Sequence, residues 1–589
     1  MKQILYLLLG CLIPFQFLTA KMYSSPERTP VDYVNPYIGN ISHLLVPTYP
    51  TVHLPNSMLR VYPERENFTG NTINGLPLIV TSHRGSSAFN LSPYQGELQK
   101  AGSIIQYGYD NEVIKPYYYS VDLDDDGMYV QYAPSHQSGI YQIDFSQTDK
   151  PAYLIFNTRN GELKTDGKSI SGYQKLGNHT QVYIYLETDQ QPLKIGTHQG
   201  AVIRTTDKST QGHNAYYILE YPKGTASVLL RYGVSFISSE QAKQNLRREI
   251  KNYNLQAVAD KGRSVWNETL GKIFVKGGTE NEKTVFYTSL YRTYERMICI
   301  SEDGRYFSAY DGQVHDDEGI PFYVDDWIWD TYRATHPLRL IIETEMESNM
   351  VNSLIRMAYQ MQPNWMPTFP EINGDSRRMN CNHGVATVLD AYNKGMRSFD
   401  LAKAYQVCKA AITEKTLAPW SSKPAGVLDQ FYKDHGYFPA LAVGEQETVP
   451  EVHSWERRQP AAVTLGTVYD EWCLGNIAQA LGDKKEADYF LKRSLNYHKI
   501  FNKETCFFHP KDSFGNFIQP FDYRYSSGVG GRDAYDENNG WVYRWDLPHN
   551  VADLVNMMGG KERFVEELER MYSTPLGKGR PDFHHQFGD

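Results

Sequence analysis

The segment 325–333 carries the residues with the clearest chemistry, because it places Trp329 beside Asp330 and Arg333 one helical turn later. An indole ring can stack on the apolar face of a sugar, while a carboxylate and a guanidinium bind neighbouring hydroxyl groups. These three residues therefore predict a binding site for a pyranose. The alternative is the start of a helix in which Asp330 and Arg333 form an ion pair on the surface.

A second candidate segment, 364–383, is a long polar loop that ends at His383. Loops of this kind commonly form the walls of binding clefts. His383 is therefore a candidate substrate ligand. With equal weight, it is a hydrogen-bonded residue at the start of the helix that follows.

A third segment, 535–549, places Glu537 among aromatic residues, Trp541, Tyr543 and Trp545, ahead of a helix expected to begin at Pro548. Aromatic surroundings favour the protonated form of a carboxyl group, which is the form that a general acid needs. Glu537 is thus a candidate catalytic acid, and Trp541 a candidate wall of the same pocket. The alternative is an exposed turn of polar residues.

Metal ligands cannot be assigned from the sequence. The run from Asp122 to Gly127 resembles a calcium loop, but Ala133 stands where such a loop needs a bidentate Glu. A hairpin turn is expected there instead. The cysteines after Cys11 form neither a zinc pattern nor a disulfide framework; they are Cys299, Cys381, Cys408, Cys473 and Cys506.

Composition narrows the class of partner. The chain has 59 basic and 68 acidic side chains and a formal charge of −9, which gives no electrostatic reason to expect nucleic acid or anionic lipid. Its 41% hydrophobic and 22% charged residues are typical of a globular protein. Aromatic residues reach 13%, which suits a β-rich protein and the stacking of sugar rings.

The elements that must position these residues divide the chain in two. Short alternating or β-branched runs fill 31–237 and predict an antiparallel β-sandwich; they include 117–123, 128–133, 141–145, 153–156, 181–186, 216–221 and 227–232. At about residue 238 the hydrophobic period changes from two to 3.6, so 238–280 is expected to be a linker helix.

Helices dominate 281–589, and their pairing into inner and outer helices predicts an α/α-hairpin toroid. We expect eight, at 282–299, 345–361, 383–396, 399–413, 463–481, 484–500, 548–558 and 561–572. A closed toroid of six hairpins needs twelve helices, so the toroid is expected to be incomplete.

The amino terminus predicts export. Residues 1–20 have a basic start, a short apolar run and a small-residue cleavage site, as in a signal peptide. A second interpretation is a bacterial lipobox that leaves Cys11 lipidated and the protein tethered to a membrane. A periplasmic or outer-surface location is expected in either case.

Several motifs, in order along the chain, resemble those of glycoside hydrolase family 92. They are Val-Asn-Pro-Tyr-Ile-Gly at 34–39, the stretch 47–58, Phe-Tyr-Thr-Ser-Leu-Tyr-Arg-Thr at 286–293, Asp-Gly-Arg-Tyr at 303–306, Trp-Asp-Thr-Tyr-Arg at 329–333, Tyr-Asp-Glu-Trp at 469–472 and the Trp-x-Tyr-x-Trp-x-x-Pro-His pattern at 541–549. The resemblance runs from about residue 31 to the last residue.

The resemblance implies a β-sandwich packed on an α/α toroid, with the active site between them. It implies calcium-dependent, inverting removal of terminal α-mannosyl residues, of the α-1,2-mannosidase kind, from mannose-containing glycans. By position, Glu537 matches the general acid, and Asp330 and Arg333 match the residues that hold the terminal mannose beside Trp329.

The general base is not matched within the chain. In the family it lies beyond a Phe-Pro-Asp-like stretch that 586–589 resembles, so we expect this chain to lack that segment and the full polypeptide to be the enzyme. Two alternatives stay open: a non-catalytic glycan-binding remnant, and another toroid enzyme such as a polysaccharide lyase.

Overall fold

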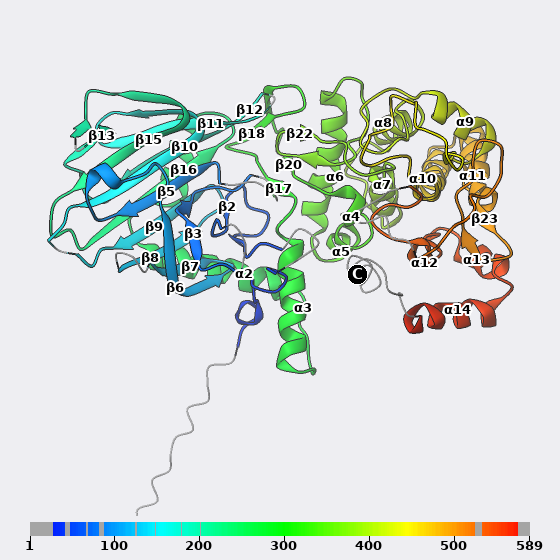
Figure 1. The fold of residues 1–589 in the computed structure, drawn as a ribbon, viewed down its shortest axis with the longest axis horizontal. Coiled ribbons are helices and arrows are strands. Elements are labelled where there is room, and N and C mark those ends of the chain that lie inside the picture. Colours follow the sequence, from blue (N-terminus) through cyan, green and yellow to red (C-terminus); the bar gives the residue numbers. More distant parts are fainter. Residues whose placement is uncertain are drawn as a thin grey trace, which may run out of the picture.

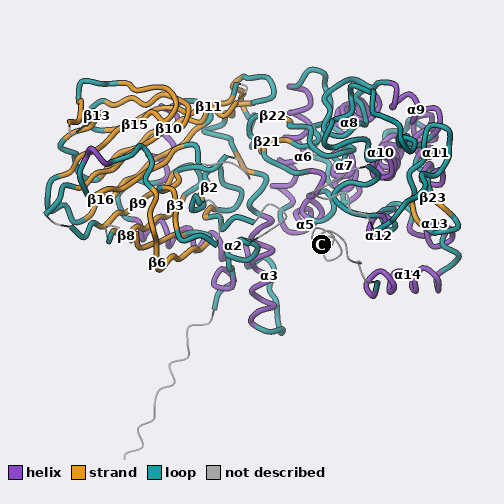
Figure 2. The backbone as a smooth tube through the Cα atoms, in the orientation of Figure 1, coloured by secondary structure: helices purple, strands orange, loops and turns teal. Residues whose placement is uncertain are grey.

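The computed structural model describes residues 28–574, apart from 42–47, 66–68, 82–86, 124–126, 148, 178, 201 and 525–532. The expected signal peptide, Cys11 and the last residues of the chain lie outside the described part. Figure 1 shows strands in one half of the molecule and helices in the other, and Figure 2 shows the same division by type of element.

The first half is a domain of antiparallel strands. Its elements are β1 (Val52–His53), β2 (Arg60–Val61), β3 (Thr72–Asn74), β4 (Leu76–Pro77), β5 (Phe89–Tyr94), β6 (Gln106–Lys115), β7 (Tyr118–Leu123), β8 (Met128–Pro134), β9 (Ser138–Asp144), β10 (Ala152–Thr165), β11 (Ser169–Gly177), β12 (Thr180–Thr188), β13 (Lys194–Gln199), β14 (Val202–Arg204), β15 (Ser209–Tyr221) and β16 (Ser227–Ser235). Strands β3 to β16 form one hydrogen-bonded sheet, whose longest path runs β14-β13-β15-β10-β11-β12-β16-β9-β8-β7-β6-β3.

The sheet folds back on itself because β10 changes partner along its length. Its first part pairs with β5 up to Thr158, and its second part pairs with β11 from Gly161 onwards. A side chain at Gly161 would collide with the carbonyl of Tyr173 on β11, so the crossing requires glycine. Tyrosines then join the two layers, since Tyr141 of β9 donates a hydrogen bond to the carbonyl of Pro77 in β4 at 2.6 Å. The expected antiparallel sandwich is confirmed.

The second half is helical. Its elements are α1 (Ser239–Glu249), α2 (Leu255–Leu270), α3 (Glu280–Thr293), β17 (Ile298–Cys299), β18 (Arg305–Ser308), β19 (Gln313–Asp316), β20 (Tyr323–Val324), α4 (Ile328–Thr331), α5 (Thr335–Ile342), α6 (Thr344–Gln360), β21 (Pro370–Glu371), β22 (Gly374–Asp375), α7 (Gly384–Asn393), α8 (Leu401–Thr413), α9 (Val427–His435), α10 (Pro460–Ala480), α11 (Lys484–Arg493), β23 (Phe501–Asn502), β24 (Phe507–Phe508), α12 (Gly540–Tyr543), α13 (Val551–Met557) and α14 (Lys561–Ser573).

Helix α10 is the inner helix around which others pack. Most of its residues are buried, and it contacts α7, α8 and α11. Gly475 of α10 allows the close approach of α11, because a Cβ there would lie 2.7 Å from the Leu491 side chain. The exposed helix α11 and the buried helix α10 thus form the expected inner and outer pair.

The eight expected helices are confirmed, but the described part of the chain contains more helices than we expected. Each of the eight expected helices has a counterpart, whereas α4, α5, α9 and α12 were not expected. The expected linker helix is two helices, α1 and α2, and the helix expected over 484–500 ends at Arg493 and is followed by a 3-10 turn. The short helices were missed because four to nine residues cannot display a hydrophobic period.

The hairpin expected near Asp122 is confirmed, because β7 and β8 pair antiparallel with Leu123 opposite Met128. The five described cysteines are all unpaired. Among the described residues, no helix has the length and apolar character needed to span a bilayer.

Candidate active site

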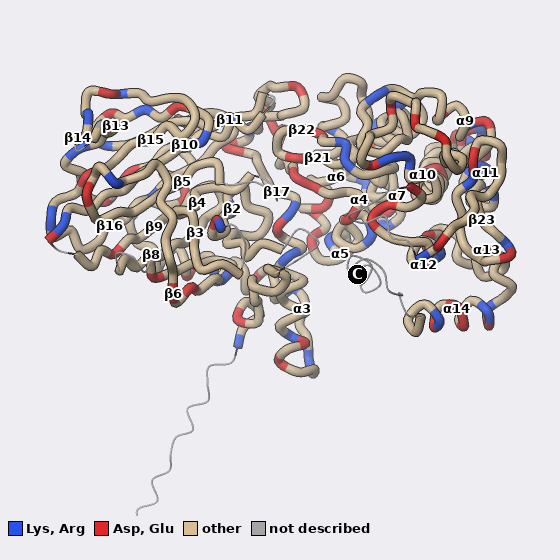
Figure 3. The backbone as a smooth tube through the Cα atoms, viewed as in Figure 1, with Lys and Arg blue, Asp and Glu red and all other residues tan. Residues whose placement is uncertain are grey.

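A pocket of about 480 Å³ brings together segments that lie far apart in the chain. Its described lining comes entirely from the helical domain: Trp329, Asp330, Tyr332, Arg333, Asn380, His383, Ala462, Gly466, Asp536, Glu537, Asn538, Val542, Tyr543, Trp545 and Asp546. Five of the six site residues expected from the sequence are among them. Figure 3 shows acidic and basic positions interspersed in the segments around α4, α5 and α7, close to this pocket.

A buried network fixes the turn that carries Trp329 and Asp330. His336 lies between two carboxylates, with Nε2 at 2.8 Å from Asp326 and Nδ1 at 2.7 Å from Glu347. Burial alone would lower the pKa of His336, but Glu347 and Asp326 raise it to about 10, so the imidazole is cationic at neutral pH. The other oxygen of Asp326 accepts hydrogen bonds from the Trp327 backbone and from Thr331, which holds the first turn of α4 in place.

Asn380 connects the three candidate segments. Its amide oxygen accepts a hydrogen bond from the indole N–H of Trp329 at 3.3 Å, and its amide nitrogen donates to Asp536 at 2.9 Å. The same nitrogen donates to Gln459, just before α10, at 2.8 Å. The indole and the residue that precedes Glu537 are therefore held by a single side chain.

Asp330 has the electrostatics of an acid or base that works near neutrality. Asp330 is exposed to solvent where it lines the pocket. Desolvation, followed by the nearby charge of Glu537, raises its pKa to about 7, while Arg296 opposes the shift. The repulsion between the two carboxylates thus favours the protonated form of Asp330.

Arg333 pairs with an unexpected partner. The surface ion pair between Asp330 and Arg333 is not formed; the guanidinium instead binds Asp546, which is 213 residues away in sequence. It also donates from Nε to the hydroxyl of Tyr332 at 2.7 Å. Asp546 raises the pKa of Arg333, so this group is a fixed positive charge at the edge of the pocket.

His383 lies at the start of a helix and also lines the pocket. It precedes the first residue of α7, and its Nδ1 lies 2.7 Å from a carboxylate oxygen of Asp470 in α10. The second oxygen of Asp470 accepts the backbone N–H of Asn382 at 2.7 Å, which fixes the direction of the pair. With Nδ1 engaged in this way, the Nε2 edge of the ring is the edge available to the pocket, where the ring packs on Tyr332 at 4.2 Å.

Glu537 lies opposite these groups, exposed to the pocket, in a left-handed backbone conformation with φ of +49°. Such conformations are uncommon for residues other than glycine and cluster at functional sites. Here the conformation lets Asp536 point inward to Asn380 while Glu537 points into the pocket.

Trp541 is not among the residues that line the pocket. Its buried ring packs edge-on against Phe507 at 5.2 Å, with Arg544 close to its other side. Tyr543 and Trp545 line the pocket in its place. Tyr543 is two positions after Trp541 in α12 and therefore points in a different direction, and Trp545 lies beyond the end of this helix.

Other pocket residues were not expected from the sequence. Asn380 and Asp546, which line the pocket, and Asp470, which binds the pocket residue His383, are joined to their partners across 51, 213 and 87 residues. The only available signal was that each lies within or beside a segment already dense in polar and aromatic residues.

Comparison with known families identifies the architecture. The model of the glycosyl hydrolase family 92 catalytic domain matches residues 241–587, and that of the family's N-terminal domain matches residues 33–235. The sheet domain and the helical domain are thus those of a glycoside hydrolase. The chain belongs to glycoside hydrolase family 92.

Individual relatives agree with this assignment. The chain is 22% identical to an uncharacterized secreted glycosidase of the fungus Arthroderma benhamiae, over 96% of this chain and 77% of the relative. It superposes with a TM-score of 0.81 on an inverting family 92 mannosidase from Bacteroides thetaiotaomicron, at 24% identity, covering 96% of this chain and 77% of that one. A family 92 α-mannosidase of the same organism, solved with mannoimidazole, gives the same TM-score at 22% identity, covering 94% and 75%.

Proposed function

We propose that the pocket removes terminal α-mannosyl residues from glycans by inverting hydrolysis, with α-1,2 linkages as the preferred substrate. The observation that carries this proposal is the convergence of Trp329, Asp330 and Arg333 with Glu537, from segments about 200 residues apart, in one pocket of a family 92 chain. The mannosidases among its structural neighbours support mannose as the sugar.

Each group has a role that follows from its place. Trp329 offers a flat face to the sugar ring, and Arg333, held by Asp546, donates hydrogen bonds to its hydroxyl groups. Glu537 donates a proton to the glycosidic oxygen as the bond breaks. Asp330, whose pKa is raised to about 7 by desolvation and by the nearby charge of Glu537, binds the hydroxyl groups of the sugar together with Arg333.

Inverting hydrolysis also needs a base carboxylate, roughly 6.5–9.5 Å from the acid, with a water molecule between that base and the sugar. We assign no described residue to this role. Asp536 is already bound by Asn380, and Asp546 is bound by Arg333.

Calcium dependence is part of the proposal, on the strength of the family resemblance. The described residues contain no group of three or more His, Cys, Asp or Glu arranged to hold a metal ion. They do not by themselves form the oxygen-rich site that calcium prefers, and no step is derived through the ion. Treatment with EDTA, followed by calcium or magnesium, tests this point: calcium alone should restore activity and raise the melting temperature.

The test of the reaction uses mannobioses of defined linkage and an activated aryl α-mannoside. In a polypeptide that also supplies the general base, we expect mannose release fastest from the α-1,2 isomer, with β-mannose as the first product seen by NMR. Glu537→Gln should abolish hydrolysis of mannobiose and reduce that of the aryl mannoside far less, because the activated leaving group needs no proton. Equal loss on both substrates would remove Glu537 from the acid role.

A binding measurement distinguishes a pocket that binds mannose without cleaving a substrate from a pocket that takes a different sugar. Mannoimidazole should bind the chain in calorimetry, and Arg333→Ala should abolish that binding. Binding without turnover would support the glycan-binding alternative, and failure to bind would contradict mannose as the ligand. We further propose that the protein acts after export, in the periplasm or at the outer surface, in agreement with its secreted relative.

A further inference from the structure

A second cavity, of about 700 Å³, lies in the helical domain behind the segment that carries Glu537. Asp533, Ala534 and Tyr535 face this cavity, whereas Asp536 and Glu537 face the active-site pocket. The carbonyl of Ala534 accepts the backbone N–H of Ala461 at the start of α10, at 3.0 Å, so the wall between the two cavities is held by main-chain hydrogen bonding. The volume lies within the range of ligand-binding cavities, about 300–1,000 Å³.

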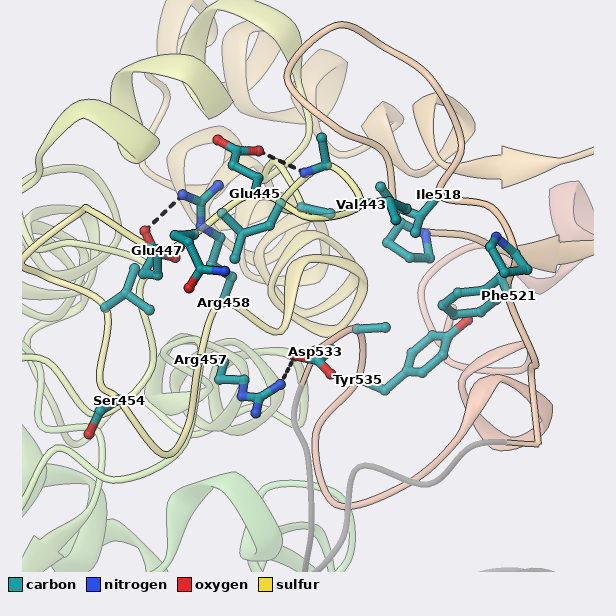
Figure 4. A pocket seen from close by; sticks show the side chains of 18 of the residues that line it. Val443, Glu445, Glu447, Ser454, Arg457, Arg458, Ile518, Phe521, Asp533 and Tyr535 are labelled. Atoms are coloured by element: carbon teal, nitrogen blue, oxygen red, sulfur yellow. Dashed lines mark hydrogen bonds and ion pairs between the residues drawn. The ribbon is translucent and has the colours of Figure 1, made fainter.

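The cavity has one apolar wall and one polar wall, as Figure 4 shows. The apolar wall contains Ile518, Phe521 and Tyr535, with Phe521 and Tyr535 in contact at 6.1 Å. The polar wall comes from the loop between α9 and α10 and contains Glu447, Ser454, Arg457 and Arg458. This division suits a sugar, which presents an apolar ring face on one side and hydroxyl groups around its edge.

The charges of the polar wall are neutralised within it. Arg458 binds both oxygens of Glu447, at 2.6 and 2.9 Å, and Arg457 binds Asp533. Glu445 accepts the backbone N–H of Ala442 at 2.7 Å. An ionic ligand would have to displace one of these partners, whereas a neutral ligand can share their remaining lone pairs and N–H groups.

Two exposed indoles stand beside this cavity. Of the nine tryptophans of the chain, only Trp420 and Trp455 are exposed, at 36% and 59%. Trp420 packs on His453, which lines the cavity, at 5.6 Å. Trp455 lies within the turn that Arg457 closes by a 2.8 Å backbone hydrogen bond to His453. An exposed indole offers a flat apolar face on which a sugar ring can stack.

The loop that supplies the polar wall is unusual in length and conformation. The 24 residues between α9 and α10 contain no helix or strand, and such long loops inside a compact domain are usually functional. Arg457 and Gln459 adopt left-handed conformations, with φ of +58° and +47°. These conformations on either side of Arg458 turn its guanidinium towards Glu447.

We propose that this cavity is a second carbohydrate-binding site, which takes a neutral oligosaccharide with one ring on the aromatic wall and a following ring at Trp455. The site differs from the active-site pocket in every lining residue. The proposal does not require the active-site pocket to be hydrolytic.

The test is affinity electrophoresis of the whole chain in gels that contain yeast mannan, laminarin or galactomannan, which are neutral polysaccharides. At least one polymer should retard the protein. Trp455→Ala removes the stacking surface, and Ser454→Trp fills the cavity from an exposed lining position; each should weaken that retardation about tenfold or more. Phe274→Ala, which removes a 76%-exposed ring far from the cavity, is the matched control and should bind normally.

A variant of the active-site pocket separates the two sites. Arg333→Ala should still be retarded if the second cavity binds the polymer. Retardation that disappears in Arg333→Ala but survives in both cavity variants would overturn the proposal, as would the absence of retardation by every polymer. Circular dichroism of each variant confirms that loss of binding is not loss of folding.

Discussion

At the residue scale, pairs of oppositely charged groups hold the segments that line the pocket. His336 neutralises Asp326 and Glu347 beneath α4, Asp546 neutralises Arg333, and Asp470 orients His383. Asp330 is the exception, because the charge nearest to it is the carboxylate of Glu537. The raised pKa of Asp330 thus reflects both its desolvation and the carboxylate of the candidate acid beside it.

This arrangement predicts an effect of pH on stability through Asp330. Because its pKa in the folded protein, about 7, lies above the ordinary value of 3.8, the folded state binds the extra proton and stability falls as pH rises from about 4 to 7. Asp330→Asn should therefore be more stable than the parent above pH 7, by about 1 kcal/mol or less because solvent reaches the group. The two proteins should melt alike near pH 4. A variant that is less stable at pH 8 would contradict the coupling to Glu537.

His336 predicts a further loss of stability at higher pH. Its pKa of about 10 exceeds the ordinary 6.5, so its contribution is complete below pH 6.5 and is lost as pH rises through 10. His336→Asn leaves Asp326 and Glu347 buried without their cation and should cost about 3–5 kcal/mol at pH 6. The penalty should shrink towards pH 10. Thermal melts across this range test it, with the exposed His315→Gln as the control.

At the scale of elements, sequence patterns predicted the parts that carry their own periodicity. The seven expected strands and eight expected helices exist, and most of them place a periodic set of apolar residues against the core. The short helices α4 and α12 show no such period, and hydrogen bonds to distant residues hold them in place instead. The same limit applies to the site. Glu537 and Asp330 could be found from composition and family motif. The direction of the Trp541 side chain, in contrast, depends on a helix of four residues, which is too short to show a hydrophobic period.

Helix α12 therefore predicts a strong dependence on its cap. The buried side chain of Asn539 accepts the backbone N–H groups of Trp541 and Val542, at 3.0 and 3.3 Å. Asn539→Ala should cost about 1–2 kcal/mol, at the upper end for a helix cap because the site is buried. Asn539→Ser retains a capping oxygen and should recover most of this loss. Because α12 presents Val542 and Tyr543 to the pocket, mannoimidazole should bind Asn539→Ala more weakly than Asn539→Ser.

At the scale of the whole molecule, the two domains are joined at the segment that places Asp330. Arg60 of β2 binds Asp325 at 2.5 Å, with both side chains 4% exposed, and Arg296 binds the same carboxylate at 3.2 Å. Asp325 is five residues before Asp330 and next to the Asp326 that His336 holds. The sheet domain, although it contributes no described residue to the pocket lining, thereby supports the turn on which the pocket depends.

Because Asp325 binds both arginines, its replacement should destabilise the protein more than the replacement of Arg60. Asp325→Asn leaves Arg60 and Arg296 buried close together without their counter-ion, so it should cost about 3–5 kcal/mol. Arg60→Met leaves the pair between Asp325 and Arg296 intact and should cost about 1–3 kcal/mol, from the lost hydrogen bonds. Calorimetry should show one transition for the parent and a separated, earlier transition for Asp325→Asn, because the two domains then unfold independently. If Arg60→Met proved the more damaging change, the ion pair would not be the element that couples the domains.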